Sequence, residues 1–463
     1  MEVPELFSSS IAYLTHSSVQ QIFFACGMSR NLDHVVETAL TALRRATSVP
    51  VVVPTANVPL HLYALDLDRD TVKQLVALAH TPVPVGYVSS MPDAHLGKGV
   101  TIGTVFASEK YVCPNAVGVD IGCGMCAIPI HGLFKDDLSR EQLESIQRKI
   151  KQRIPTGFDQ HKKALPKTQE ILARISEEHP PSKWLLNQLG TNVKPAEQLG
   201  TLGGGNHFLE VVFDESDHQV WVMLHSGSRN IGNITAAYHD QVAAQVMKSM
   251  GLPQPEERGL NYMPIESHEG AAYLQDMNWC QEYAFQNRQA MLELMLEIVC
   301  DEARHGYPDM EHAVNIHHNY CSCEQCTFTD PQSGRTVSKN LWITRKGATS
   351  AKNGEFGIIP GSMGVGSFIT KGKANPLSWS SCSHGAGRRM SRTKAIKEIP
   401  QEDFVHFMKE MNVVCDTHPG VRDEAPQAYK DLTVVMKNQT DLVDVVHRLL
   451  PLVNVKGFEK KNR

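Results

Sequence analysis

Residues 203–225 read GGGNHFLEVVFDESDHQVWVMLH, and this stretch predicts an antiparallel β-hairpin. Two apolar, strand-like runs flank a short polar turn. If Phe213 pairs with Gln219, the antiparallel register sets His207 opposite His225, with their Cβ atoms about 5 Å apart. We therefore expect the two imidazoles to share one face of the hairpin, where they either bind metal or form a hydrogen-bonded pair.

Glu210 does not fit this register easily. It lies at an odd offset from His207, and side chains alternate between the two faces of a strand. A regular strand would therefore point Glu210 away from His207. Either a bulge in the strand or a ligand wrapped around it would be needed for the two side chains to act together.

Upstream of the hairpin, Asp120 and Cys123 lie three residues apart in the run VGVDIGCGM at 117–125. A carboxylate suits hard divalent ions and a thiolate suits softer ones, while glycines permit the tight turn that aims both side chains inward. Alone, the run is an ordinary turn. Together with the hairpin histidines and the pair His317-His318, this run predicts a metal site with mixed ligands. Spacing alone does not show whether His317 or His318 would bind the metal.

Two loops downstream have the composition of phosphate-binding segments. Residues 360–367 (PGSMGVGS) offer hydroxyls and unencumbered backbone N–H groups. In residues 381–389 (SCSHGAGRR), small neighbours expose His384 just before two arginines, so the imidazole can attack phosphorus while the arginines neutralise phosphate oxygens. Ordinary surface loops can look similar. Because the chain lacks both a P-loop and a Lys-x-Asp-Gly run, a covalent nucleotide would need another nucleophile, and His384 is the candidate.

Composition sets the outer limits. The chain has 463 residues, 41% hydrophobic and 21% charged, which predicts a soluble globular protein. Its net charge of −5 gives no global reason to expect nucleic acid, so any RNA binding must come from a local basic patch. The first residues do not resemble a secretory signal, and apolar runs are too short to span a membrane. We expect a cytoplasmic protein with eleven reduced cysteines, an organelle not being excluded.

The organisation along the chain predicts a core with peripheral additions. Residues 1–50 are expected to form an accessory N-terminal extension with a helix over 32–46. Helices are also expected over 70–80 and 281–300, and residues 133–198 read as a largely helical peripheral segment. The fold class we expect is α+β: a single large domain with mixed β-sheets around a central metal cleft and helices outside.

Cys321, Cys323 and Cys326 form a C-x-C-x-x-C run directly after the histidine pair. Such a run can hold a structural zinc ion, but the sequence has no second cysteine pair at finger-like spacing. We interpret the three as reduced thiols.

Seven motifs, in order, resemble the RtcB family of GTP-dependent RNA-splicing ligases. They are MPDAHLGKG (91–99), GVDIGCG (118–124), GGNHF (204–208), HSGSR (225–229), His318-Asn319, PGSMG (360–364) and SHGAGR (383–388). The resemblance runs from about Asp70 to Lys456, so we treat residues 51–463 as an RtcB-like catalytic domain. Residues 1–50 are not covered. Ala94 stands where the family pattern leads us to expect valine.

The resemblance implies a ligase that joins an RNA 3′-phosphate or 2′,3′-cyclic phosphate to a 5′-hydroxyl, in tRNA splicing or RNA repair. The implied route passes through a histidine–GMP intermediate on His384 and then an RNA 3′-guanylylated intermediate. GTP and two Mn²⁺ ions are the implied cofactors. Residue types alone would suggest zinc or iron before manganese. The implied partners are RNA, as tRNA halves or broken ends, and an activating protein. The protein is expected to be a monomer that does not bind a membrane.

Site residues follow from the same resemblance. The implied metal ligands are Asp120, Cys123, His207, His225 and His318. The implied nucleotide contacts are Asn206, His207, Phe208, Leu209, Glu210, His318, Asn319, Pro360, Gly361, Ser362, Met363, Ser367, His384, Gly385, Ala386, Gly387 and Lys456.

Some roles stay open at the level of sequence. Arg229 and the pair Arg345-Lys346 are candidates for phosphate contacts, with ordinary ion pairing as the alternative. A dinuclear metal-dependent phosphoesterase or nuclease would need the same metal ligands but neither the nucleophile nor a guanosine pocket. A non-catalytic metal or nucleotide sensor is the third possibility.

Overall fold

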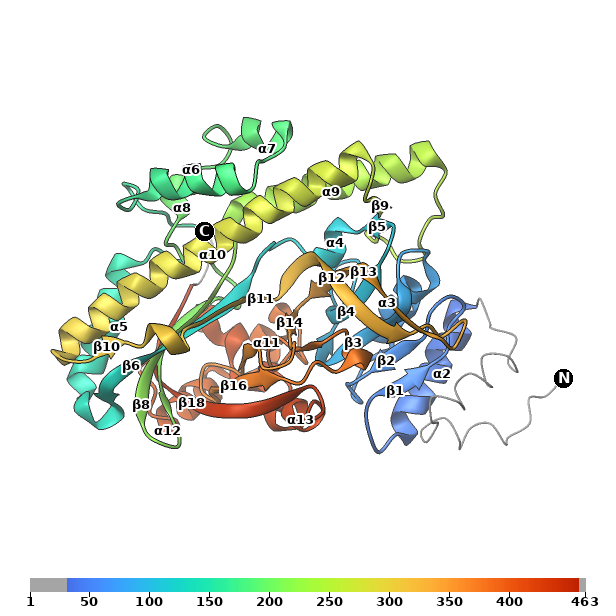
Figure 1. The fold of residues 1–463 in the computed structure, drawn as a ribbon. Coiled ribbons are helices and arrows are strands. Elements are labelled where there is room, and N and C mark those ends of the chain that lie inside the picture. Colours follow the sequence, from blue (N-terminus) through green and yellow to red (C-terminus); the bar gives the residue numbers. More distant parts are fainter. Residues whose placement is uncertain (1–30, 458–463) are drawn as a thin grey trace.

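The computed structural model describes residues 31–457, and two large β-sheets form the centre of this part of the chain (Figure 1). The six-stranded sheet has the order β1 (Val51–Val53), β2 (Leu60–Leu62), β3 (Val85–His95), β4 (Ile102–Ser108), β13 (Thr336–Lys346) and β12 (Asn319–Thr329). Its β2 and β3 are parallel and its other neighbours antiparallel, so the sheet is mixed.

The eight-stranded sheet is antiparallel throughout. Its order is β10 (Tyr307–Pro308), β6 (Gly124–Phe134), β8 (Gln219–Ser226), β7 (Phe208–Asp214), β18 (Val443–Lys456), β16 (Ser367–Gly372) and β15 (Phe356–Pro360), with β11 (Val314–His317) also paired to β6. Two short sheets complete the strands: β14 (Ala348–Ser350) with β17 (Ser381–Ser383), and β5 (Tyr111–Val112) with β9 (Met263–Pro264).

Helices cover the outside of the sheets, and the long α9 and α10 run diagonally across the top of the view in Figure 1. The helices are α2 (Leu32–Arg45), α3 (Arg69–His80), α4 (Pro114–Val117), α5 (Arg140–Arg153), α6 (Thr168–Glu178), α7 (Lys183–Gln188), α8 (Pro195–Gln198), α9 (Arg229–Met250), α10 (His268–Ala303), α11 (Arg392–Glu398), α12 (Gln401–Glu410) and α13 (Leu432–Lys437). The expected α+β class, with mixed sheets inside and helices outside, is confirmed.

Apolar periodicity explains how the helices attach. In α3 the predicted apolar face is buried, and it shares one core with α2 and the first strands of the six-stranded sheet. Asp68, two residues before the expected start of the helix, caps α3 by accepting the Thr71 N–H at 2.7 Å. Helix α10 begins well before the predicted residue 281, and its apolar face packs with α5 against the eight-stranded sheet. The segment 133–198 contains α5 to α8.

The predicted hairpin is present, but its register is wrong by one residue. Phe213 pairs with Val220 rather than Gln219, so His225 lies opposite Phe208. The turn takes up the extra residue because His218 adopts a left-handed conformation (φ 66°). Glu210 therefore lies on the same face as Phe208 and His225, and no bulge within β7 is needed to bring it there.

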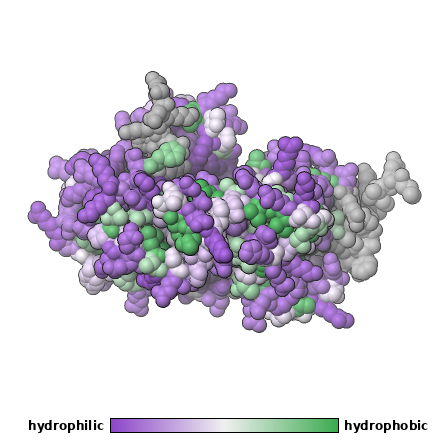
Figure 2. Space-filling view, turned by 90° about the horizontal axis from the view of Figure 1, so that it is seen from above, coloured by the Kyte–Doolittle hydropathy of each residue, from purple (hydrophilic) through white to green (hydrophobic). Residues whose placement is uncertain are grey.

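None of the helices within residues 31–457 is long and apolar enough to cross a membrane. Seen from above, the surface is mostly hydrophilic, with apolar residues in small interrupted patches (Figure 2).

Candidate metal centre and nucleotide cavity

Five predicted ligands meet at the edge of the eight-stranded sheet. Asp120 and Cys123 lie in the turn between α4 and β6, and the three histidines lie at the start of β7, the end of β8 and the junction of β11 with β12. The Cys123 Sγ is 3.4 Å from His207 Nε2 and 3.3 Å from His225 Nε2. The row extends in both directions: Asp120 Oδ2 is 3.0 Å from His207 Nε2, and His318 Nε2 is 3.2 Å from His225 Nε2.

Backbone carbonyls orient two of these imidazoles. His207 Nδ1 lies 2.9 Å from the Leu202 carbonyl oxygen, and His225 Nδ1 lies 3.3 Å from that of Asn206. A ring that donates through Nδ1 keeps its Nε2 lone pair free, which is the usual arrangement of a metal-binding histidine. The Nε2 atoms therefore face the shared centre as acceptors.

The structure decides between the two adjacent histidines. His318 faces the centre, whereas His317 turns away, with its Nδ1 2.9 Å from the Gly122 carbonyl oxygen and 3.1 Å from Arg288 Nη2. Arg288 is fully buried and also donates to the carbonyls of Gly122 and Ser226. One guanidinium thus ties together the three backbone segments that carry Cys123, His225 and His318.

Electrostatics favour a cation at this centre. Burial, and then neighbouring imidazoles, lower the pKa of His225 and His318 well below the ordinary value, so both imidazoles are neutral. Burial works against the ionised Asp120, but His207 lowers its pKa below the ordinary value. Burial, and then Asp120, raise the pKa of the Cys123 thiol well above its usual range. A bound cation would reverse that last effect by favouring the thiolate.

These residues fit a metal ion by their donor chemistry. Within residues 31–457, Cys123, His207 and His225 form a buried group whose ligand atoms all lie within 4.8 Å of one another. Gly227 shows how tightly the centre is built, because a Cβ there would lie 2.3 Å from both carboxylate oxygens of Asp120. Cys321, Cys323 and Cys326 lie along β12 and are free thiols outside this group.

His384 lies next to the metal-capable centre, and a carboxylate supports it from behind. Its ring centroid is 4.8 Å from that of His318. Its Nδ1 is 2.6 Å from Oδ2 of the fully buried Asp93, in a contact not aligned as a hydrogen bond. The same oxygen accepts the backbone N–H groups of His384 and Gly385, each at 3.2 Å. His384 therefore directs Nδ1 towards Asp93, and Nε2 is the ring nitrogen left to face the cavities.

Sequence reasoning did not assign a role to Asp93, although it lies in the motif at 91–99. Gly387 explains the close fit of the two segments: its φ is 75°, and a Cβ there would lie 2.1 Å from the Asp93 carbonyl oxygen.

Two cavities meet at His384. The larger, about 490 Å³, has His95, Phe208 and His225 in its wall together with a run of residues from Gly385 to Arg392. The smaller, about 280 Å³, has Asp120, Cys123, His318 and Asn319 in its wall. Ile102, Asn206 and His384 border both. A nucleophile on His384 therefore has access to a group in either space.

A buried carboxylate organises the positive charge of the larger cavity. Glu424 accepts from Arg388 Nη1 at 3.0 Å, from Lys456 Nζ at 2.6 Å and from Tyr429 Oη at 2.6 Å, and it also contacts Arg392. Although burial opposes ionisation, the surrounding cations lower the pKa of Glu424 to about 2. Glu424 thus holds Arg388, Arg392 and Lys456 in place, and the three cations outnumber this single carboxylate. Sequence reasoning missed Glu424, which lies in no glycine-rich motif.

The predicted nucleotide contacts divide into two groups. Those bordering a cavity are Asn206, Phe208, His318, Asn319, Pro360, Gly361, His384, Gly385, Ala386, Gly387 and Lys456. Those that border neither are His207, Leu209, Glu210, Ser362, Met363 and Ser367. Met363 is buried in an apolar cluster with Phe404, and Ser367 pairs with Leu449 between β16 and β18. Asn454 donates to Glu210 at 2.7 Å, and burial raises the pKa of Glu210 to about 7.

Three cationic side chains suggested as phosphate contacts are engaged with protein atoms. Arg345 is fully buried and pairs with Glu324 at 2.5 Å, so it is structural. Arg229 donates to Thr201 Oγ1 and to the Gly157 carbonyl. Lys346 donates to two carbonyls in the wall of the smaller cavity, and burial lowers its pKa to about 7.

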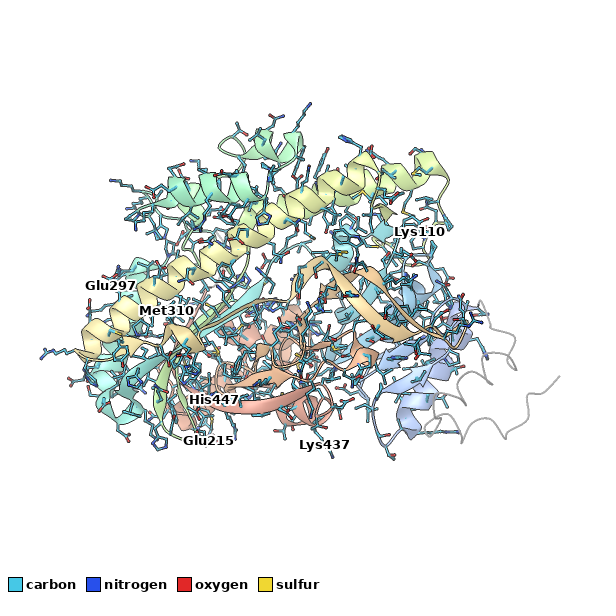
Figure 3. The ribbon with its side chains drawn as sticks, viewed as in Figure 1. Lys110, Glu215, Glu297, Met310, Lys437 and His447 are labelled. Atoms are coloured by element: carbon cyan, nitrogen blue, oxygen red, sulfur yellow. The ribbon has the colours of Figure 1, made fainter. Side chains whose placement is uncertain are left out.

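The fold and site define a metal-capable α+β protein, and side chains fill the space between its helices and strands (Figure 3). Comparison identifies its family. The family model described as tRNA-splicing ligase RtcB matches residues 74–457. The RNA-splicing ligase RtcB of Escherichia coli (strain K12) is 39% identical over 87% of this chain and 98% of its own length. The tRNA-splicing ligase RtcB of Methanococcus maripaludis is 29% identical over 85% of this chain and 92% of its own. The RNA-splicing ligase RtcB of Mycobacterium tuberculosis is 30% identical over 83% and 100%. The chain belongs to the RtcB family of RNA ligases.

Proposed function

We propose that this protein joins an RNA end carrying a 3′-phosphate or 2′,3′-cyclic phosphate to a 5′-hydroxyl end, at the expense of GTP, in tRNA splicing or RNA repair. The observation that carries the proposal is the position of His384. Its Nδ1 faces Asp93, and its ring borders both the basic cavity and the cavity walled by metal-ligating residue types. A nucleophile between two spaces suits transfer of a nucleotide from one bound partner to another.

The larger cavity is where we propose that GTP binds. Its basic side chains, Arg388, Arg392 and Lys456, neutralise phosphate oxygens, and Glu424 keeps them in position. Backbone groups of Pro360, Gly361 and Gly385–Gly387 line the same space. We assign the guanine and ribose contacts to this wall and to Asn206 and Phe208. Glu210, together with Leu209, Ser362, Met363 and Ser367, stays part of the proposed nucleotide site as its supporting layer.

In the first step, His384 Nε2 attacks the α-phosphorus of GTP. A P–N bond forms, the bond to the bridging oxygen breaks, and pyrophosphate leaves. Positive charge grows on the imidazole as the bond forms, and the buried Asp93 carboxylate 2.6 Å from Nδ1 stabilises it. The product is the proposed histidine–GMP intermediate, which stores the activation energy that an RNA 3′-phosphate lacks.

In the second step, an oxygen of the RNA 3′-phosphate attacks the same phosphorus, the P–N bond breaks, and His384 is regenerated. A cyclic phosphate must first be opened by water to the 3′-phosphate. In the third step, the 5′-hydroxyl oxygen of the other RNA attacks the phosphorus of the RNA 3′-phosphate, and the bond from that phosphorus to the oxygen shared with GMP breaks. GMP leaves, the hydroxyl loses its proton, and a phosphodiester remains.

Two Mn²⁺ ions are the metal cofactors we propose. Asp120, Cys123 and His207 would hold one, and Cys123, His225 and His318 the other. We assign Cys123 to both because its Sγ contacts imidazoles on two sides. Such ions supply Lewis-acid neutralisation of phosphate oxygens. The donor atoms fit a divalent ion, and the choice of manganese rests on the family resemblance.

RNA would be held mainly through its backbone, which predicts salt-sensitive binding with little base preference. The proposal extends to tRNA halves or broken RNA ends as substrates, a monomeric enzyme in the cytoplasm, and an activating protein partner.

The test is a joining reaction with RNAs of defined ends. With GTP and Mn²⁺, fragments ending in 3′-phosphate and 5′-hydroxyl should be joined, whereas fragments ending in 3′-hydroxyl and 5′-phosphate should not. Substituting ATP for GTP should abolish joining. Metal-dependent cleavage of RNA without joining would favour the phosphoesterase alternative, and no reaction with metal and GTP present would favour a sensor.

A further inference from the structure

Phe158 is the most exposed large apolar side chain in the described part of the chain, with 79% of its surface accessible. It lies in the loop between α5 and α6, inside the peripheral segment that the chemistry above does not use. Single apolar residues are common on surfaces. This one differs because hydrogen bonds hold its loop on both sides and because three exposed lysines follow it in the same loop.

Hydrogen bonds fix the loop to the segment that leads into the metal centre. Gly157 donates its N–H to the Gly203 carbonyl at 2.8 Å, and its own carbonyl accepts from Arg229 Nη2 at 2.7 Å. On the far side, His161 N–H donates to the Glu197 carbonyl at 2.9 Å, and its Nε2 is 3.0 Å from the Gly200 carbonyl. The exposed ring is therefore presented by a loop anchored on both sides.

The anchor is close to the reacting groups. Asn206 borders both cavities and lies three residues after Gly203. The Cα atoms of the two residues are therefore at most about 11 Å apart. At the end of β18, a Cβ on Gly457 would lie 3.0 Å from the Gly157 N and 1.9 Å from the Gly203 carbonyl oxygen. The loop between α5 and α6 therefore packs against the end of β18, immediately beyond the cavity residue Lys456.

Three exposed lysines follow in the same loop: Lys162, Lys163 and Lys167. Within residues 31–457, no carboxylate lies within ion-pair distance of their ammonium groups, although many other surface lysines and arginines are paired. An exposed aromatic ring and unpaired cations in one loop form a combination that can bind single-stranded nucleic acid, since the ring stacks on a base and the cations attract phosphates.

We propose that Phe158 is a stacking platform for an unpaired base near the reacting end of the RNA, with Lys162, Lys163 and Lys167 holding the adjoining phosphates. This inference rests on the proposed function, because it assumes that RNA is the substrate. It assigns a binding role to the peripheral segment and predicts that the enzyme prefers ends whose terminal bases are unpaired.

The test measures binding of a fluorescent single-stranded RNA to the full chain by anisotropy, with Phe158→Ala, Phe158→Trp and, as a matched control, Leu186→Ala. Leu186 is 59% exposed on α7, in the same peripheral segment. Phe158→Ala should weaken binding about 5- to 150-fold, the range for loss of one aromatic–base stack. Phe158→Trp should retain affinity, and its fluorescence should be quenched by RNA. Leu186→Ala should bind as the wild type does.

A second RNA, with abasic nucleotides at its terminal positions, separates stacking from loss of structure. The difference between wild type and Phe158→Ala should disappear on this RNA. The salt dependence should be unchanged by Phe158→Ala, but replacing the lysines by glutamine should lower the log–log slope by about 0.7 for each phosphate that is no longer neutralised. Equal binding of the intact RNA by wild type and Phe158→Ala would overturn the proposal and leave a protein partner as the better occupant. Weaker binding by Phe158→Ala that persists on abasic RNA would also overturn it.

Self-guanylylation without RNA keeps this test distinct from that of the proposed function. Wild type and Phe158→Ala should form the GMP adduct at equal rates. A wild type that forms no adduct contradicts the proposed function whatever the RNA-binding result, and unequal rates would contradict a role confined to RNA.

Discussion

Replacing Asp93 by asparagine tests the proposed support of the nucleophile. The carboxylate is fully buried, Oδ2 lies 2.6 Å from His384 Nδ1, and Oδ1 has no partner in the described structure. Unit charges about 4 Å apart interact by about 4 kcal/mol at an effective dielectric constant of about 20. If the imidazole carries half to all of a unit charge in the transition state, the stabilisation removed is about 2–4 kcal/mol. Formation of the GMP adduct should slow about 30- to 1,000-fold.

The assay is single-turnover transfer from α-labelled GTP to the protein, with metal and GTP saturating. Asp66→Asn is the matched control, because Asp66 is exposed and pairs with Lys430 at 2.8 Å. That variant should form the adduct at the wild-type rate. An Asp93→Asn rate within threefold of wild type, in a variant with unchanged thermal stability, would refute the role assigned to Asp93.

Three further predictions follow from the same geometry. Cys123→Ser should weaken Mn²⁺ binding, measured by calorimetry, and reduce adduct formation in parallel, whereas a decrease in only one of the two would argue against a shared ligand. Glu424→Gln should lower the free energy of unfolding at pH 7 by about 3 kcal/mol. The pKa of Glu424 is about 2 in the folded protein against 4.5 in the unfolded chain, so its contribution to stability is present above pH 4.5 and is lost as pH falls towards 2. A decrease of less than about 1 kcal/mol, measured by urea denaturation, would be inconsistent with the cation cluster. Glu210 affects stability in the opposite direction: its pKa is raised to about 7 in the folded protein, so the ionisation of its carboxyl costs stability as pH rises. The free energy of unfolding of Glu210→Gln, relative to that of the wild type, should therefore increase by about 1 kcal/mol from pH 6 to pH 8. A difference in unfolding free energy that does not change with pH would contradict burial of the carboxyl.

The hairpin shows what the sequence could and could not predict. Alternating apolar residues on both sides of a polar turn identified β7 and β8 and brought His207 and His225 together. The register depends on the left-handed backbone conformation of His218, which cannot be predicted from the residue type. The one-residue shift places Glu210 on the same face as His225, which the predicted register did not.

Asp93 and Glu424 were missed for a different reason. Each acts through partners far along the chain: Asp93 supports a histidine 291 residues away, and Glu424 binds Lys456, 32 residues away. Their importance comes from burial beside a specific charge, which only the fold reveals. The candidate metal ligands Asp120, Cys123, His207 and His225 were recognisable from the sequence because they stand in glycine-rich runs. Spacing did not choose between His317 and His318; the family resemblance implied His318, and the structure turns His317 towards Arg288.

The most direct test of the proposed mechanism is the site of GMP attachment. The protein is incubated with GTP and Mn²⁺ but no RNA, and the labelled peptide is sequenced by mass spectrometry. We predict one GMP on His384, through a bond that is labile in acid and stable in alkali, and no adduct in His384→Ala. An adduct on another residue, or one that persists in His384→Ala, would contradict the mechanism.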